Sequence, residues 1–148
     1  MIISHRGNVN GKNESLENYP DYIDEAIKCQ FDVEIDVWIK NGFEIFLGHD
    51  EPQYQVNISW LLERKDKLWI HCKNVEAIIY FNKINDFNYF WHQNDDVTLT
   101  SKSYIWAYPG KQSIENSIAV MPEIFNDDVS ACLGICTDFP IRYKNENV

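Results

Sequence analysis

Three short fragments in the first third of the chain carry residue types that suit phosphoryl chemistry. They read ISHRGN from Ile3 to Asn8, VEIDV from Val33 to Val37, and GHD from Gly48 to Asp50. Each fragment lies within, or at the end of, a short apolar run that is typical of a β-strand. HRG or HD alone is common by chance, so the functional indication comes from the ordered set on successive predicted strands.

His5 and His49 are predicted to transfer protons. An imidazole titrates near neutral pH, so it can exchange a proton with a phosphoester oxygen. Two histidines at the ends of two strands therefore predict an acid and base pair across a phosphodiester. Arg6 follows His5 and offers a planar guanidinium that matches phosphate. Asp50 follows His49 and either orients it, adds charge to a metal site or caps the next loop.

Glu34 and Asp36 are predicted to bind a metal ion. They stand two positions apart on a predicted strand, so both side chains point to the same face. Two carboxylates facing the inside of a barrel repel each other and lose their hydration. A divalent cation relieves both problems, and oxygen ligands favour Mg²⁺ or Ca²⁺. The alternative is that the pair forms the polar side of a half-exposed strand.

In order and chemistry, these motifs resemble those of the glycerophosphodiester phosphodiesterase family. That family carries HRG, an E-N pair that opens the first helix (here Glu17-Asn18), E-x-D, and then HD. Looser matches follow at Ile70 to Lys73 (IHCK, for E-x-K), at Ile105-Trp106 (a late strand bearing Trp) and at Thr137 to Pro140 (TDFP, for T-D-[YF]-P). The likeness spans nearly the whole chain and is most specific before Asp50.

The resemblance implies metal-dependent hydrolysis of a small glycerol- or sugar-linked phosphodiester by the two histidines. The chain departs from the family at His71, where the family has a metal-binding glutamate. Histidine is neutral and softer, which shifts metal preference towards Mn²⁺ or Zn²⁺. His71 is therefore either the third ligand or a structural histidine in a degenerate site. Lys73 lies two residues further on the same face and is expected to pair with phosphate.

Weaker candidates for the pocket lining follow apolar strands or belong to the matched motifs. They are Glu17, Asp50, His92, Trp106 and Asp138. The resemblance implies that Trp106 lines the substrate pocket. The others are equally typical of helix caps and turns.

The composition predicts one domain over residues 1–148, with 45% hydrophobic residues to form its core. The net charge of −10 argues against a nucleic-acid partner, because such a surface repels phosphate backbones. No apolar run reaches the ~20 residues of a membrane span. The first predicted strand begins almost at Met1, which leaves no signal peptide, so we expect a cytoplasmic protein. The four cysteines lack zinc-site spacing and are predicted to be buried thiols.

Eight strand-like runs predict the fold. They are Ile2–Ser4, Asp32–Trp38, Glu44–Leu47, Leu68–Cys72, Tyr89–His92, Tyr104–Ala107, Ile118–Met121 and Leu133–Cys136. With catalytic groups at the strand ends, this pattern favours a reduced TIM-type (β/α)₈ barrel whose helices are trimmed in the second half. Such barrels typically need ~250 residues. The wall left bare by the trimmed helices leads us to expect a homodimer that buries aromatic residues such as Trp91, Tyr104, Trp106 and Tyr108.

Two amphipathic helices are predicted in the first half. One covers Pro20 to Lys28, with Ile23, Ala26 and Ile27 on its inner face. The other covers Val75 to Ile84. Its predicted inner face consists of Val75, Ile78, Ile79 and Ile84.

Three functional hypotheses remain open on the sequence. The first is the metal-dependent phosphodiesterase. The second is a catalytically degenerate barrel that binds a phosphorylated ligand or a protein partner, which the departure at His71 supports. The third is a metal-dependent lyase or isomerase acting on a sugar, which is disfavoured because His5, His49 and Arg6 are all present.

Overall fold

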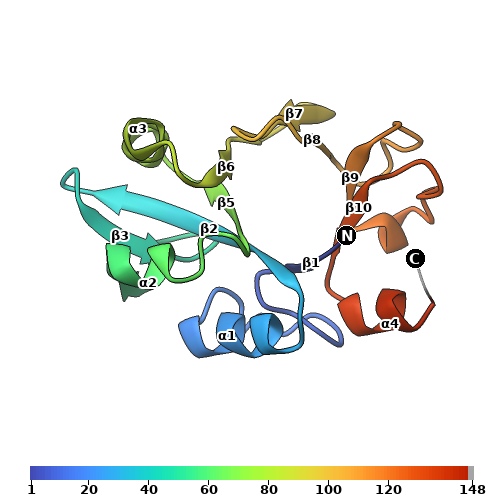
Figure 1. The fold of residues 1–148 in the computed structure, drawn as a ribbon, viewed down its shortest axis with the longest axis horizontal. Helices are drawn as coiled ribbons and strands as arrows, with labels where there is room; N and C mark the ends of the chain where they lie inside the picture. Colours follow the sequence, from blue (N-terminus) through green and yellow to red (C-terminus); the bar gives the residue numbers. More distant parts are fainter. Residues whose placement is uncertain (147–148) are drawn as a thin grey trace.

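The computed structural model describes residues 1–146, in which ten strands form one curled sheet (Figure 1). The strands are β1 (Ile2–His5), β2 (Asp32–Lys40), β3 (Glu44–Leu47), β4 (Tyr54–Val56), β5 (Leu68–Cys72), β6 (Asn88–Phe90), β7 (Val97–Leu99), β8 (Ile105–Ala107), β9 (Ser117–Val120) and β10 (Gly134–Thr137). The helices are α1 (Pro20–Lys28), α2 (Ile58–Leu62), α3 (Val75–Ile84) and α4 (Pro140–Asn145), with a 3₁₀ turn η1 (Pro122–Ile124).

Parallel pairing runs through the sheet in the order β6-β5-β2-β1-β10-β9-β8. Strand β3 pairs antiparallel with β2 and carries β4, while β7 pairs antiparallel with β8. Strand β1 is central, with Ile3 opposite Cys136 of β10 and His5 opposite Glu34 of β2. The first and last strands, β1 and β10, are therefore neighbours, as expected.

The predicted (β/α)₈ barrel is wrong. The sheet is a curled half-barrel, because β6 and β8, at the two ends of the parallel run, do not pair with each other. The four helices of the described part are short, with ten residues in the longest, α3. Antiparallel hairpins, β3-β4 and β7-β8, stand where a barrel has crossover helices. The physical reason is chain length, because 148 residues cannot supply a helix after each strand.

The two faces of the sheet have different roles because side chains alternate along each strand. Val33, Ile35 and Val37 of β2 belong to the core that α1 and α3 cover on the outside of the curl (Figure 1). Glu34 and Asp36 alternate with them and point to the inner face, where both are buried. The inner face thus carries the carboxylates that the sequence placed on one side of this strand.

An apolar cluster fills the inner face. Its buried members are Ile3, Trp69, Phe90, Trp106, Ile118, Val120 and Cys136. The ring of Trp106 packs against those of Phe90 and Trp69, with centroids 4.6 and 5.7 Å apart. Trp106 is therefore a core residue and is not among the residues that line the pockets described below, contrary to the expectation from the resemblance.

Of the predicted inner face of helix α3, only Ile78 packs against the core, and the fully buried residues are others. Ala77 and Phe81 are fully buried. In contrast, Val75 is 63% exposed and Ile79 is 50% exposed. The orientation is set at the helix start, where the Asn74 side chain accepts a hydrogen bond from the Ala77 amide and donates to the carbonyl of Ile39 in β2. This cap holds the first turn against the sheet on the small side chain of Ala77.

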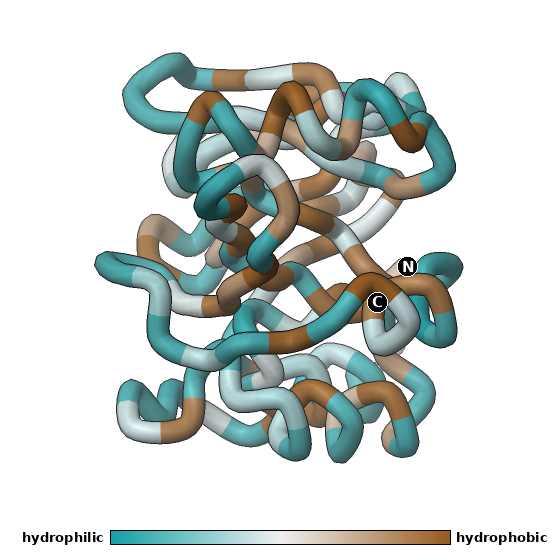
Figure 2. The backbone as a smooth tube through the Cα atoms, turned by 90° about the vertical axis from the view of Figure 1, so that its left-hand side faces the viewer, coloured by the Kyte–Doolittle hydropathy of each residue, from teal (hydrophilic) through white to brown (hydrophobic). Residues whose placement is uncertain are grey.

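No helix in the described range is long and apolar enough to cross a membrane. In Figure 2, hydrophobic stretches run through the middle of the molecule, and hydrophilic stretches prevail at the left and right edges of the view.

Candidate functional site

Strand register brings the sequence motifs together. His5 on β1 lies opposite Glu34 on β2, and Asp36 on β2 lies opposite His71 on β5. Because the three strands are parallel neighbours, these side chains share one rim of the inner face. Glu34, Asp36 and His71 each offer a ligand atom, and the three atoms lie within 4.8 Å of one another.

This triad fits a divalent cation. The Nδ1 atom of His71 is 3.3 Å from Asp36 Oδ1 and 3.6 Å from Glu34 Oε1. The other ring nitrogen, Nε2, lies 2.9 Å from the backbone carbonyl of His92 and can only donate to it, so Nδ1 is the free ligand atom of the neutral ring. Glu34 Oε2 is buried without a hydrogen-bond partner, as expected for an oxygen that a cation would satisfy.

Cationic groups of the chain already compensate Asp36. Burial alone would raise its pKa, but the contacts with His49 and His71 and the charge of Arg6 hold the pKa well below its usual range. For His71 the effect of burial is the opposite, because burial lowers the pKa of a histidine. The carboxylates of Asp36 and Glu34 outweigh this effect and raise the pKa of His71 to about 9. Near neutral pH and without a metal ion, His71 is therefore a cation paired with both carboxylates.

Asn18 anchors Asp36. Its amide nitrogen donates to Asp36 Oδ2 at 2.9 Å, and its amide oxygen accepts from the Asp36 backbone N–H at 2.9 Å. Asn18 adopts a left-handed backbone conformation with φ of 62°, which asparagine tolerates better than most residues. The sequence showed Asn18 only as half of the E-N pair, and its role as a buried anchor was not predicted.

His5 is held by Asp138 at the end of β10. The His5 Nδ1 and Asp138 Oδ1 atoms are 2.8 Å apart, and Asp138 is only 2% exposed. Burial would raise the pKa of Asp138, but the hydrogen bond and charge of His5 lower it. An ionised carboxylate can only accept, so Nδ1 carries the proton and Nε2 is free towards Glu34, whose Oε2 lies 4.0 Å away.

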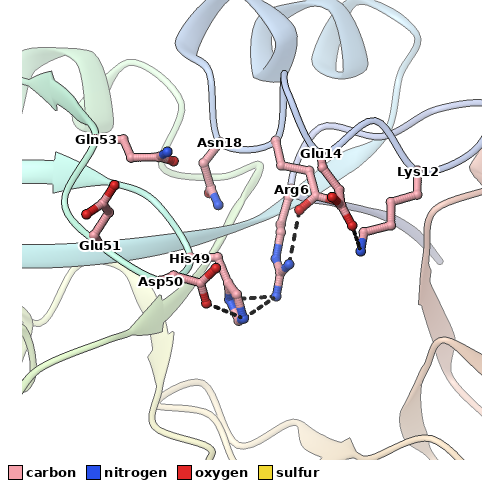
Figure 3. Close-up of a pocket in the computed structure, with 9 residues that line it drawn as sticks. Arg6, Lys12, Glu14, Asn18, His49, Asp50, Glu51 and Gln53 are labelled. Atoms are coloured by element: carbon pink, nitrogen blue, oxygen red, sulfur yellow. Dashed lines mark hydrogen bonds and ion pairs between the residues drawn. The ribbon is translucent and has the colours of Figure 1, made fainter.

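Arg6 lies between Glu17, Asp36 and His49. Its NH1 atom donates to Glu17 Oε2 at 3.1 Å, and its Nε atom is in ion-pair contact with Asp36 Oδ2 at 2.9 Å without hydrogen-bond alignment. Its NH2 atom is 2.7 Å from His49 Nδ1 (Figure 3). Burial lowers the Arg6 pKa, but Asp36, Glu34 and Glu17 raise it overall. NH2 also lies 3.4 Å from His49 Nε2, so NH1 is the nitrogen that keeps a second N–H for a ligand.

Two pockets open on either side of His49. The first, of about 520 Å³, contains Arg6, His49, Asp50 and Glu17 in its lining, and Figure 3 shows Arg6 and His49 pointing towards each other in it. The second, of about 500 Å³, is lined by His49, His71, Lys73, His92, Gln93, Asn94 and Tyr108. A ligand at the rim thus has room for a group on each side of His49.

The remaining candidates take different positions. Lys73 Nζ lies 3.5 Å from Asp36 Oδ1 and 3.4 Å from His49 Nδ1, so it belongs to the site. His92 lines the second pocket, and its own carbonyl orients His71. Asp50 Oδ1 is 3.6 Å from His49 Nε2, but the Asp50 side chain is 94% exposed. Asp138 was expected at the pocket mouth and lies instead behind His5.

A second group of ligand-type residues consists of His5, Glu17 and Asp138. The side-chain amide of Asn8 lies between the two carboxylates and donates to both, at 3.0 Å to Glu17 and 2.8 Å to Asp138. The two carboxylates therefore share a neutral donor, in addition to Arg6 on Glu17 and His5 on Asp138. Asn8 is part of the ISHRGN fragment, but nothing in the sequence pattern singled it out.

Comparisons of the chain with protein-family models, with curated proteins and with solved structures find no significant match.

Proposed function

We propose that this protein is a metal-dependent phosphodiesterase that hydrolyses a small glycerol- or sugar-linked phosphodiester. The observation that carries the proposal is the buried carboxylate pair of Glu34 and Asp36 with a histidine at each end. His5 Nε2 lies 4.0 Å from Glu34, and His49 Nδ1 lies 3.4 Å from Asp36. The resemblance of the motifs to the glycerophosphodiester phosphodiesterase family supports the same function.

Glu34, Asp36 and His71 would hold the cation, with Mg²⁺, Ca²⁺ and Mn²⁺ as candidates. A bound divalent cation would supply positive charge that stabilises the phosphoryl oxygens in the transition state. The second N–H of Arg6 NH1 and the ammonium of Lys73 would bind the phosphate. Together they would direct the diester to the rim between the two pockets.

The two histidines would then move the protons. One accepts the proton of the attacking hydroxyl as its oxygen bonds to phosphorus, and the other donates a proton to the alcohol oxygen as its bond to phosphorus breaks. Asp138 fixes the tautomer of His5 with Nε2 free, which suits that histidine to exchange a proton with the substrate. The attacking hydroxyl belongs to water or to the substrate itself.

A second function has one observation in its favour. Without a metal ion, the carboxylates are already paired with Arg6, His71 and Lys73. Such charge compensation suits a protein that binds a phosphorylated ligand or partner without turning it over. In that case phosphate binding through Arg6 and Lys73 would survive while hydrolysis would be absent.

Substitution of the histidines tests the proposal. On a panel of glycerol- and sugar-linked diesters with Mg²⁺, Ca²⁺ or Mn²⁺, His5→Ala and His49→Ala should each lower kcat by at least roughly 10²-fold. Circular dichroism should show an unchanged fold. Near-normal rates in both variants would refute the proton-transfer role. Binding of inorganic phosphate by a wild type that cleaves no diester would favour the second function.

A further inference from the structure

We propose that the side chain of Asn8 is a positioning residue that aligns the catalytic His5 and the phosphate-binding Arg6 with each other. The inference rests on the proposed function, because only there is His5 catalytic and Arg6 a ligand of the phosphate. Asn8 reaches each of them through a different carboxylate. Its Nδ2 atom donates to Asp138 Oδ1, which holds His5, and to Glu17 Oε1, whose other oxygen holds Arg6.

The hydrogen bonds of Asn8 are used completely. Its Nδ2 atom makes the two donations just described, which is all that a primary amide nitrogen can give. Its Oδ1 atom accepts from the Asn13 backbone N–H at 3.0 Å and from the Tyr22 hydroxyl at 3.2 Å. The residue is fully buried, so water does not replace these partners. A neutral amide with two donors and two acceptors fits this position, and a carboxylate or an apolar side chain does not.

The backbone of Asn8 is fixed as well. Its N–H donates to the His5 carbonyl at 3.0 Å, and its carbonyl accepts from the Ser4 hydroxyl at 2.8 Å. The turn between His5 and Asn8 contains two left-handed residues, Arg6 with φ of 54° and Gly7 with φ of 92°. This turn aims Arg6 at the rim, and the Asn8 side chain holds the Arg6 guanidinium through Glu17.

The amide also separates two buried negative charges. Glu17 and Asp138 are 8% and 2% exposed, and the N–H groups of Asn8 lie between them. Without these donors the carboxylates repel each other and lose a hydrogen bond each, so both move away from that position. His5 and Arg6 then lose the partners that orient them, and a displacement of about 1 Å costs up to about 10²-fold in rate.

Two substitutions test this role. Asn8→Leu has a similar shape and no donor, so kcat should fall by about 10- to 100-fold at every pH. Asn8→Asp cannot donate as a carboxylate, but its protonated form can donate one hydrogen bond. The kcat of Asn8→Asp relative to wild type should therefore rise as the pH is lowered, and that of Asn8→Leu should not. Tyr22→Phe is the matched control, because it removes only one donor to Oδ1, and its kcat should stay within about threefold of wild type.

A proton NMR measurement gives a readout that does not depend on turnover. The Nδ1–H of a histidine bonded to a carboxylate resonates at low field, and Asp138→Asn identifies the His5 signal by removing it. This signal should be shifted or lost in Asn8→Leu and retained in Tyr22→Phe. An unchanged signal and an unchanged kcat in Asn8→Leu would overturn the inference. If wild type cleaves no diester, the proposed function fails, and the NMR result then decides only whether Asn8 holds His5 in place.

Discussion

At the scale of single residues, the site depends on a histidine placed between two buried carboxylates. His71 Nδ1 is within 3.6 Å of both Glu34 and Asp36, and the His92 carbonyl fixes which nitrogen faces them. In the metal-free protein a proton occupies the place where a metal ion would bind. Proton and metal therefore compete for the same nitrogen.

This competition predicts a strong pH dependence of metal affinity. Because the pKa of His71 is about 9, the ring must lose a proton to bind a metal ion at lower pH. The affinity for Mn²⁺ should therefore rise up to about tenfold for each unit of pH between about 6.5 and about 8.5. Isothermal calorimetry at these pH values measures it. In His71→Glu this dependence should disappear, and equal pH slopes in the two proteins would contradict the assignment of His71 as a ligand.

Arg6 gives a second prediction at this scale. Arg6→Lys should raise KM by roughly 10-fold or more with a smaller change in kcat, because an ammonium cannot reproduce the planar arrangement that contacts Glu17, Asp36 and His49 at once. Steady-state kinetics on a glycerol-linked diester measure both constants. Arg142→Lys is the control, since Arg142 pairs with Glu146 at an exposed helix end. An unchanged KM in Arg6→Lys would remove Arg6 from phosphate binding.

The sequence was sufficient to group the residues that lie close together along a strand or in register. The spacing of Glu34 and Asp36 placed both on one face. The resemblance to the family singled out His71, and the register of β2 with β5 places it opposite Asp36. The contacts of Asp138 and Asn8 were not predictable in this way. His5 and Asp138 are 133 positions apart, and nothing in local spacing tells which carboxylate folds back onto a given histidine.

At the scale of elements, a glycine turn connects the site to helix α1. A Cβ atom on Gly7 would lie 2.8 Å from Cδ1 of Tyr22, and the φ of 92° is unfavourable for any other residue. Only glycine allows β1 to turn this closely against α1. The loop that carries Arg6 and Asn8 therefore depends on a close contact between backbone and helix.

Gly7→Ala should be clearly more destabilising than Gly42→Ala. Gly42 also has a positive φ, of 79°, but a Cβ there meets nothing within 4 Å. Backbone strain alone should cost Gly42→Ala about 1–2 kcal/mol, and the collision with Tyr22 should add about 1–3 kcal/mol in Gly7→Ala. Urea unfolding followed by circular dichroism measures both free energies. Equal losses in the two variants would show that the contact with Tyr22 is unimportant.

Segments with a periodic or apolar pattern were predictable, and segments without one were not. The bounds of α1 and α3 agree with the predicted helices, and β3 and β5 with two predicted strands. Strands β4 and β7 have three residues each and lack an apolar run, so the sequence did not predict them. They are strands because they pair with the neighbouring strands β3 and β8. Most of the predicted inner face of α3 was wrong. The Asn74 cap and the small Ala77 set the orientation of the helix, and its largest apolar residues do not set it.

At the scale of the whole molecule, a curled half-barrel provides the same rim that a full barrel would. Parallel strands β1, β2, β5 and β10 stand side by side, so their ends carry His5, Glu34, Asp36, His71 and Asp138 to one place. The predicted reduced (β/α)₈ barrel does not form, because β6 and β8, at the two ends of the parallel run, do not pair with each other. The central parallel strands, and not complete closure, position the candidate site.

The most direct test of this account is hydrolysis of a small glycerol-linked phosphodiester before and after chelation. The account predicts turnover with Mg²⁺, Ca²⁺ or Mn²⁺ that a chelator abolishes and that added metal restores. Glu34→Gln should lose at least about 10²-fold in kcat at the same metal concentration, because a ligand and its charge are removed. Cleavage that survives chelation, or a wild type that cleaves no diester with any of these metals, would contradict it.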